Sequence, residues 1–143
     1  NALNKVGEEC KISHLFEKSF NKLSGGEKRK VHFARTLIQM YNKDFKTTSR
    51  YIMLDEPTAN LDISHELQLI NILKNKANEG FGVFIILHDL NLAYHFSDKV
   101  ALIKEGKIHA FGSPQEVFKE DILSEVYDLK VHFDTSTKKI SYY

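Results

Sequence analysis

Two short apolar runs, separated by a stretch of helical length, constrain the fold of this chain more than any other feature. Residues 51–54 and 83–87 form the runs, and between them apolar residues recur at helical spacing from Ile63 to Leu73. A shorter helical segment and a third apolar run, at residues 100–103, follow. This alternation of strands and helices is typical of a parallel sheet. The sequence therefore predicts an α/β fold whose first two strands are buried.

Turn and cap signals set the ends of these elements. Asp62 and Asp89 can each cap the helix that follows. Pro57 ends the first strand, because a proline cannot continue a central strand. Residues 105–106 form a turn that leads the third strand into residues 107–110.

Further elements are predicted towards the two ends of the chain. A short amphipathic helix is predicted by apolar residues at roughly helical spacing: Leu3, Val6, Cys10 and Leu15. A longer helix begins at Gly25, and residues 131–133 and 139–142 predict a terminal hairpin. No repeat or linker divides the sequence, so we expect one unit.

Composition excludes several classes of protein. The 143 residues are 42% hydrophobic, which suffices for a core, and the net charge of +1 provides no overall field to attract nucleic acid or an anionic membrane. The longest apolar run, residues 83–87, is far shorter than the roughly 20 residues of a membrane-spanning helix. The single cysteine, Cys10, excludes an internal disulfide and is most simply a packing residue. The sequence begins without Met or a signal segment, which favours a fragment over a secreted protein.

Three polar side chains directly follow the first two predicted strands. Asp55 and Glu56 end the first strand, and His88 ends the second. Ligands gather at the carboxyl ends of parallel strands, where one carboxylate could hold Mg²⁺ while its neighbour orients a water for phosphoryl transfer. Taken by itself, the acidic pair is more simply explained as turn and cap residues, and the histidine as a hydrogen-bonded residue at a strand edge. Taken alone, these residues leave the function open.

A glycine motif precedes the longer helix. Ser24, Gly25 and Gly26 expose backbone N–H groups at a helix N-terminus, which attracts anions such as phosphate. Ser24 and Glu27 also have the spacing of a capping box. A capping box does not need two glycines, each of which costs a helix roughly 1 kcal/mol. We therefore expect a ligand to approach this backbone closely.

Four motifs in this order resemble those of ATP-binding-cassette (ABC) ATPases. Residues 23–27 resemble the signature motif, residues 51–56 the Walker B strand and residues 57–62 the D-loop, and His88 resembles the switch histidine. The resemblance implies the parallel-sheet P-loop NTPase fold, of which this chain would be the C-terminal portion with part of the helical subdomain.

The same resemblance implies a subdivision of residues 1–143. Residues 1–40 would hold the end of the helical subdomain and the signature helix. Residues 51–143 would hold the Walker B, D-loop and switch-histidine part of the catalytic core. Only the last dozen residues fall outside the likeness.

The resemblance also implies the roles of the candidate catalytic residues, with ATP and Mg²⁺ as cofactors. Asp55 would bind Mg²⁺, Glu56 would act as the general base, and His88 would contact the γ-phosphate. None of the departures from the family pattern removes a catalytic group. They are glutamate for the commoner glutamine at Glu27, lysine for arginine at Lys30, and Ala-Asn for Ser-Ala at residues 59–60.

A second set of residues would act on ATP held by the opposite subunit of a dimer. The signature residues Ser24, Gly25, Gly26 and Glu27 would bind this nucleotide, and Asp62 would communicate across the dimer. The implied partners are therefore a second ATPase subunit and the transmembrane permease subunits, without nucleic acid. The protein would lie at the cytoplasmic face of the cell membrane and reach the membrane only through the permease.

Other functions share parts of this pattern. The string Leu-Ser-Gly-Gly-Glu-Lys also resembles the signature of ABC ATPases of DNA repair and chromosome maintenance. Residues 106–117 resemble the segment that follows the switch region in transporter ATPases, and the absence of long coiled-coil heptads also favours transport. A catalytically inactive interaction module is disfavoured because Glu56 and His88 are both present.

The cargo and the phosphate loop are the remaining questions. Residues 88–93 resemble importers of iron chelates, haem and cobalamin, and the long polar stretch at residues 41–50 resembles an insertion of haem importers. A surface loop with no bearing on cargo is the alternative reading of that stretch. No Gly-x-x-x-x-Gly-Lys-Ser/Thr motif occurs among the seven glycines. We therefore expect this chain alone to bind Mg-ATP negligibly and to hydrolyse none.

Overall fold

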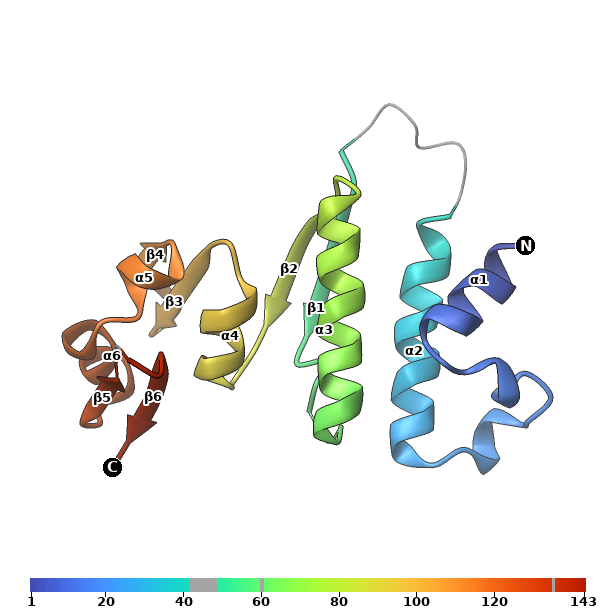
Figure 1. Ribbon diagram of the computed structural model, residues 1–143, viewed down its shortest axis with the longest axis horizontal. Coiled ribbons are helices and arrows are strands. Elements are labelled where there is room, and N and C mark those ends of the chain that lie inside the picture. Colours follow the sequence, from blue (N-terminus) through green and yellow to red (C-terminus); the bar gives the residue numbers. More distant parts are fainter. Residues whose placement is uncertain (42–48, 60, 135) are drawn as a thin grey trace. The chain divides into compact units, whose positions relative to one another are not determined.

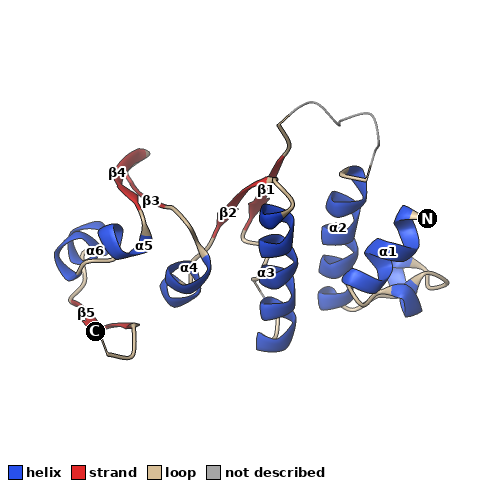
Figure 2. Ribbon diagram, turned by 45° about the horizontal axis from the view of Figure 1, so that its top comes forward, coloured by secondary structure: helices blue, strands red, loops and turns tan. Residues whose placement is uncertain are grey.

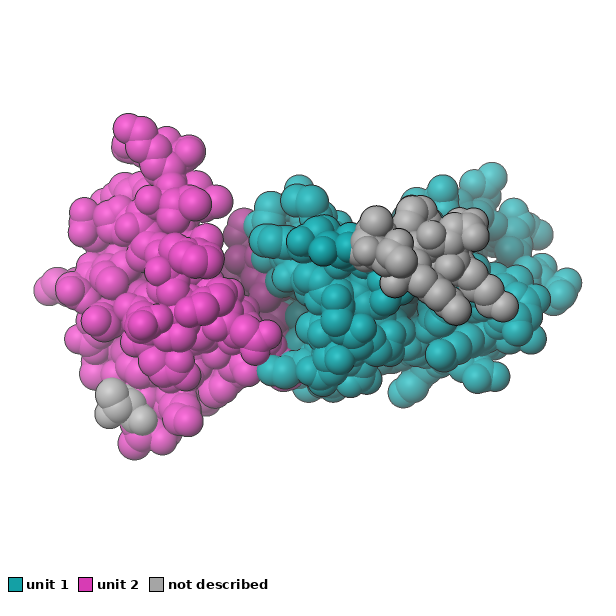
Figure 3. Space-filling view, turned by 90° about the horizontal axis from the view of Figure 1, so that it is seen from above, with its two compact units in different colours: residues 1–86 teal, residues 87–143 magenta. Residues whose placement is uncertain are grey.

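The computed structural model describes residues 1–41, 49–59, 61–134 and 136–143. The chain divides into two compact units, residues 1–86 and 87–143, which are shown in different colours in Figure 3. The boundary between them lies after Ile86, whereas the subdivision implied by the family resemblance lies between residues 40 and 51 and stays a prediction. Within the described ranges, every helix is too short or too polar to span a bilayer.

The first unit contains helices and a pair of parallel strands. In chain order they are α1 (Ala2–Glu9), α2 (Gly25–Gln39), β1 (Tyr51–Asp55), α3 (Ile63–Asn78) and β2 (Gly82–Ile86). β1 pairs in parallel with β2, with Tyr51 opposite Gly82 and Asp55 opposite Ile86. The predicted parallel pairing of the first two strands is therefore confirmed. Figure 1 shows α2 and α3 running alongside each other, with the two strands beside α3.

The two strands are half-buried, and the prediction that they are buried is wrong. Ile52 is only 1% exposed, whereas its neighbour Met53 is 77% exposed. Successive side chains of a strand point to opposite faces of the sheet, and α3 packs against one of these faces. The other face is an exposed apolar surface, which we call the open sheet face: Tyr51, Met53, Phe84 and Ile86.

The first helix is shorter than the periodic pattern predicts. α1 ends at Glu9, and Lys11 adopts a left-handed backbone with φ of 53°. Leu15 belongs instead to a separate 3₁₀ turn, although it is as buried as Val6 and Cys10. Burial raises the pKa of the Cys10 thiol to about 12, with a further contribution from the nearby charge of Glu9. Cys10 is thus the packing residue that the sequence suggested.

A buried lysine joins the three helices of the first unit. The Nζ atom of Lys76, on α3, lies 3.0 Å from the carboxylate of Glu9 and 3.1 Å from the hydroxyl of Tyr41, which follows α2. It also donates to Glu79 at 3.2 Å, and the residue is 2% exposed. Burial alone would lower the pKa of Lys76, but hydrogen bonds to Tyr41, Glu9 and Glu79 outweigh it and leave the pKa above the usual lysine value. Lys76 therefore remains charged inside the unit.

The second unit combines short helices with two hairpins. In chain order its elements are α4 (Leu90–Phe96), β3 (Val100–Lys104), β4 (Lys107–Gly112), α5 (Pro114–Val117), α6 (Glu120–Tyr127), β5 (Val131–Asp134) and β6 (Lys139–Tyr142). The predicted third strand, β3, pairs antiparallel with β4 and not within a parallel sheet. Its turn explains the difference, because Glu105 and Gly106 both have positive φ, as a tight hairpin requires. The predicted terminal hairpin, β5 with β6, is confirmed.

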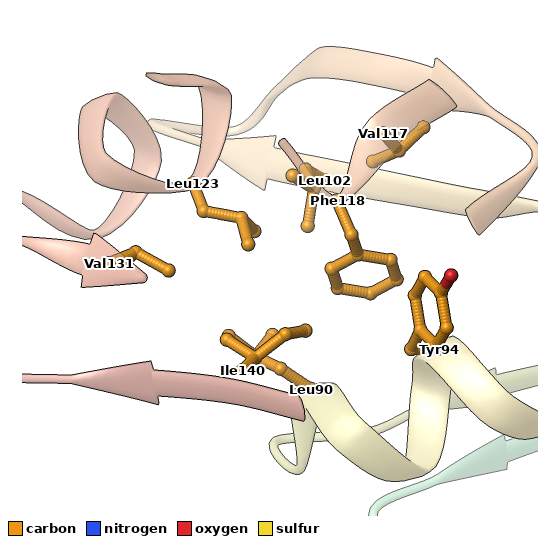
Figure 4. Packing of buried hydrophobic residues seen from close by; sticks show 8 residues of the cluster. All are labelled: Leu90, Tyr94, Leu102, Val117, Phe118, Leu123, Val131 and Ile140. Atoms are coloured by element: carbon orange, nitrogen blue, oxygen red, sulfur yellow. The ribbon is translucent and has the colours of Figure 1, made fainter. Parts of the chain in front are cut away.

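One apolar core holds the second unit together. Figure 4 shows its side chains converging from both hairpins and from α4, α5 and α6. Eight buried residues form it: Leu90, Tyr94, Leu102, Val117, Phe118, Leu123, Val131 and Ile140. The terminal hairpin is thus part of the core.

Candidate functional site

Most of the predicted site residues lie at one end of the first unit. Figures 1 and 2 show that α2 and α3 begin at the same end of the unit, and β1 runs towards that end. Ser24 caps α2, Asp62 caps α3, and Asp55 is the last residue of β1. Two helix N-termini and a strand end therefore face the same side, which is where α/β proteins bind phosphate groups.

The capping box predicted at the start of α2 is confirmed. The Ser24 hydroxyl accepts a hydrogen bond from the Glu27 backbone N–H at 3.2 Å, and the Glu27 carboxylate accepts one from the Ser24 N–H at 2.8 Å. The bond from the Ser24 backbone lowers the pKa of Glu27, and the ammonium of Lys18, 3.5 Å away, adds to the effect. Glu27 is therefore ionised at neutral pH and fixes the entry of the chain into α2.

The two glycines at this helix end have open surroundings. A methyl group added at Gly25 or at Gly26 would meet no atom of the described chain within 4 Å. Neither residue has a positive φ that would demand glycine. Packing and backbone conformation within the described chain thus give no reason for glycine at either position.

The acidic pair sits where β1 turns out of the sheet. Asp55 and Glu56 are both exposed, and Glu56 has a left-handed backbone with φ of 43°. The turn continues with a hydrogen bond from the Ala59 N–H to the Glu56 carbonyl at 3.2 Å. A left-handed conformation in a non-glycine residue costs on the order of 1–3 kcal/mol, and such residues gather at functional sites. Glu56 is therefore a turn residue, as the simpler reading held, in a strained conformation.

Asp62 uses both carboxylate oxygens to start α3. One oxygen accepts from the Ser64 hydroxyl at 2.8 Å and from the His65 backbone N–H at 3.0 Å, while the other contacts the His65 ring. The bonds from Ser64 and His65 hold the pKa of Asp62 well below its usual range. Its predicted role as a helix cap is confirmed. Asn60, which precedes it in the D-loop motif, lies outside the described residues.

The segment after β1 also lies against α2. Pro57 and Leu61 line a cavity of about 20 Å³ together with Arg29 of α2 and Leu69 of α3. One guanidinium nitrogen of Arg29, Nη1, is buried and has no hydrogen-bond partner among the described residues. The cavity is large enough for one water molecule. The sequence did not indicate this contact between the signature helix and the D-loop motif, because neither pattern shows what lies next to it in space.

His88 belongs to the second unit. It follows β2, is exposed, and precedes Asp89, which caps α4. The Asp89 carboxylate accepts from the backbone N–H groups of Asn91 at 2.8 Å and Leu92 at 3.0 Å, so the predicted cap is confirmed. Ser24, the acidic pair and Asp62 thus belong to the first unit, and His88 lies at the start of the second.

No preformed multidentate metal site occurs in the described ranges, where no three His, Cys, Asp or Glu side chains come together as ligands. The exposed carboxylate of Asp55 at a strand end does fit Mg²⁺, which keeps several waters and takes one or two protein carboxylates. Asp55 as the Mg²⁺ ligand stays a prediction.

Solved structures show the fold. Over 99% of this chain and 56% of the other, the structure superposes with a TM-score of 0.80 on a protein described as a metal-chelate type ABC transporter in an inward-facing conformation, at 19% identity. CbiO1 of Clostridium perfringens, part of the ABC transporter complex CbiONQ, gives a TM-score of 0.66 at 29% identity over 87% of this chain and 47% of that one.

Curated relatives agree with these structures, although no family model matches the sequence. The hemin import ATP-binding protein HmuV of Bartonella henselae is 39% identical over 132 residues, which cover 92% of this chain and 50% of that protein. HmuV of Bartonella quintana is 46% identical over 126 residues, covering 88% and 46%. The chain belongs to the ABC ATPase family. It spans about half the length of the curated ABC ATPases that it matches.

Membership in the ABC ATPases confirms the predicted recognition and fold class, a P-loop NTPase fold of which the structure is consistent with a C-terminal portion. The roles assigned to individual residues by family resemblance stay predictions. The polar stretch at residues 41–50, read as an insertion of haem importers, lies mostly outside the described residues.

Proposed function

We propose that the full-length protein is the ATP-binding and ATP-hydrolysing subunit of an ABC importer of haem or another iron chelate. The relatives support the cargo class, since the curated ABC ATPases cited above are named for hemin import. The observation that carries the ATPase proposal is the exposed acidic pair where β1 ends.

This end of the first unit suits phosphoryl transfer. Asp55 would hold Mg²⁺, whose positive charge would offset the negative charge of the phosphate groups. Glu56 would orient and deprotonate the attacking water, and its strained turn would hold the carboxylate beyond the strand end. His88 would contact the γ-phosphate.

The signature end of α2 would bind the ATP of a second subunit. Its backbone N–H groups carry the positive end of the helix dipole, which favours a phosphate. The open space around Gly25 and Gly26 supports this role, because a side chain there would stand between the backbone and a ligand. Glu27 would keep this end in shape through the capping box, and Asp62 would communicate across the dimer from the start of α3.

The proposed protein therefore works as an assembly. Its partners would be a second ATPase subunit and the transmembrane permease subunits, and the latter would hold it at the cytoplasmic face of the membrane. The phosphate-binding loop would come from residues of the full-length protein outside this chain, since these 143 residues contain no such motif.

Substitution of the proposed base tests the activity. In the full-length protein, Glu56→Gln should bind ATP but lose turnover by typically 10²- to 10⁴-fold, the contribution of a positioned base. Glu17→Gln, which changes an exposed carboxylate outside the site, is the matched control and should leave the rate unchanged. Steady-state ATPase of the Glu56 variant within about twofold of wild type would be incompatible with a general base.

A further inference from the structure

The side chain of Asn91 is bonded to the backbone of the terminal hairpin. Its Oδ1 atom accepts from the Ile140 N–H at 2.8 Å, and its Nδ2 atom donates to the Ile140 carbonyl at 3.3 Å. Asn91 lies in the first turn of α4 and Ile140 lies within β6, 49 positions further along the chain. A primary amide presents a donor and an acceptor side by side, so one side chain satisfies both backbone groups of Ile140.

This pairing lies at the edge of the core of the second unit. Ile140 is 5% exposed and lies beside Leu90 of α4 in the core, as Figure 4 shows. Buried backbone groups need partners, so the two bonds fix the register of β6 against the start of α4. An apolar contact alone would allow the strand to slide along the helix.

The proposed switch histidine lies just before this first turn of α4. His88 stands three positions before Asn91, and Asp89, between them, accepts the Asn91 backbone N–H at 2.8 Å. The backbone from His88 to Asn91 is therefore held from two sides, by the Asp89 cap and by the amide bonds to β6.

We propose that Asn91 is a positioning residue for His88, and that the terminal β5–β6 hairpin serves the nucleotide site through this side chain. The inference rests on the proposed ATPase function and extends it to the last dozen residues of the chain, which the family motifs do not cover. It assigns the hairpin a part in catalysis besides its part in the core.

Kinetics of the full-length protein test the role. Asn91→Leu keeps the size of the side chain and removes both bonds. It should lower kcat by about tenfold or more with the KM for ATP changed by less than about twofold, because a displaced catalytic group weakens the transition state more than substrate binding. Val131→Ala is the matched control, since it trims the core of the same hairpin without touching Asn91. The control should keep kcat within about twofold at temperatures well below its Tm.

A double-mutant cycle distinguishes positioning from plain destabilisation. In a His88→Ala background, Asn91→Leu should cause no further fall in kcat, because residues that act through one group are not additive. Asn91→Asp, which keeps the acceptor for Ile140 and loses the donor, should give an intermediate rate and covers the case in which the leucine variant does not fold. Equal losses for the Asn91 variants and Val131→Ala, or undiminished losses in the His88→Ala background, would overturn the inference.

The outcomes also separate this inference from the function on which it rests. A wild-type protein that does not hydrolyse ATP overturns both. If wild type is active and His88→Ala slows it, but Asn91→Leu and Asn91→Asp behave as wild type, the function stands and the positioning role fails. Hydrogen exchange at the Ile140 amide adds a check without turnover, since exchange should be faster in Asn91→Leu and unchanged if the bond contributes nothing.

Discussion

At the residue scale, the site combines capping with an open helix end, and Ser24 belongs to both. Its hydroxyl caps α2, while Gly25 and Gly26 beside it leave the backbone accessible. A substitution at Ser24 therefore changes two properties at once: the stability of the helix and the access of a ligand to the backbone at its start. Any test of a role in nucleotide binding has to separate the two effects.

Ser24→Arg in the full-length protein should leave ATP binding by the monomer intact and block ATP-driven dimerisation, because an arginine side chain fills the space at the helix end. Nucleotide titration of the monomer and size-exclusion chromatography with ATP measure the two properties. Ser113→Arg is the matched control, since Ser113 forms the same kind of capping box at α5. Loss of ATP affinity in the Ser24 monomer would place this serine in the site of its own subunit.

Lys76 is the buried residue whose loss should cost most stability in the first unit. Lys76→Met removes the ammonium that pairs with Glu9 and donates to Tyr41, and a broken buried ion pair costs about 3–5 kcal/mol. Glu9 and Glu79 are partly exposed and can regain water, so we expect about 2 kcal/mol, below that range. Denaturant unfolding measures the loss. Lys74→Met, on the exposed side of the same helix, should change stability by less than about 0.5 kcal/mol. Equal effects of the two variants would contradict a stabilising role for the buried contacts of Lys76.

At the scale of elements, sequence periodicity located the strands and the caps but not their surroundings. Asp62, Asp89 and Ser24 were identifiable because a cap depends on residues two or three positions away. The open face of β1 was not, since a continuous apolar run reads the same with one covered face or two. The burial of Lys76 could not be predicted for a similar reason. Its partners come from three different segments, and lysine is rarely buried.

The start of α3 should respond to acid. Because the folded pKa of Asp62 is depressed, its contribution to stability is present above the unfolded pKa, about 4 for aspartate, and is lost as pH falls through the folded pKa. Asp62→Asn keeps a neutral cap and should therefore be less stable than wild type at pH 6, with the gap closing below about pH 4. Thermal unfolding against pH measures this. A gap that stays constant with pH, or an equal response in the exposed control Asp98→Asn, would count against an ionised cap.

At the scale of the whole molecule, the proposed function needs a phosphate-binding loop that these 143 residues do not contain. Glu56, Ser24 and Asp62 all belong to the first unit, yet the seven glycines include no phosphate-loop motif. In phosphoryl transfer that loop holds the β- and γ-phosphates, and without it the base has nothing to act on. The motifs predicted the family, whereas only the structure shows that α2 lies beside the D-loop segment.

The isolated 143-residue chain should therefore bind Mg-ATP negligibly and hydrolyse none. Calorimetry with Mg-ATP on the purified chain measures binding, and the full-length protein serves as the positive control. Micromolar affinity, or hydrolysis that Glu56→Gln abolishes, would show a phosphate site within these residues.

The open sheet face affects the solubility of this chain in solution. This face is a contiguous apolar patch on two adjacent strands, formed by Tyr51, Met53, Phe84 and Ile86, and such patches favour self-association. Sulfate strengthens apolar association because it is excluded from protein surfaces. The isolated chain should thus precipitate at a low sulfate concentration and self-associate less when dilute. Replacing Met53 and Phe84 by threonine should reduce this self-association.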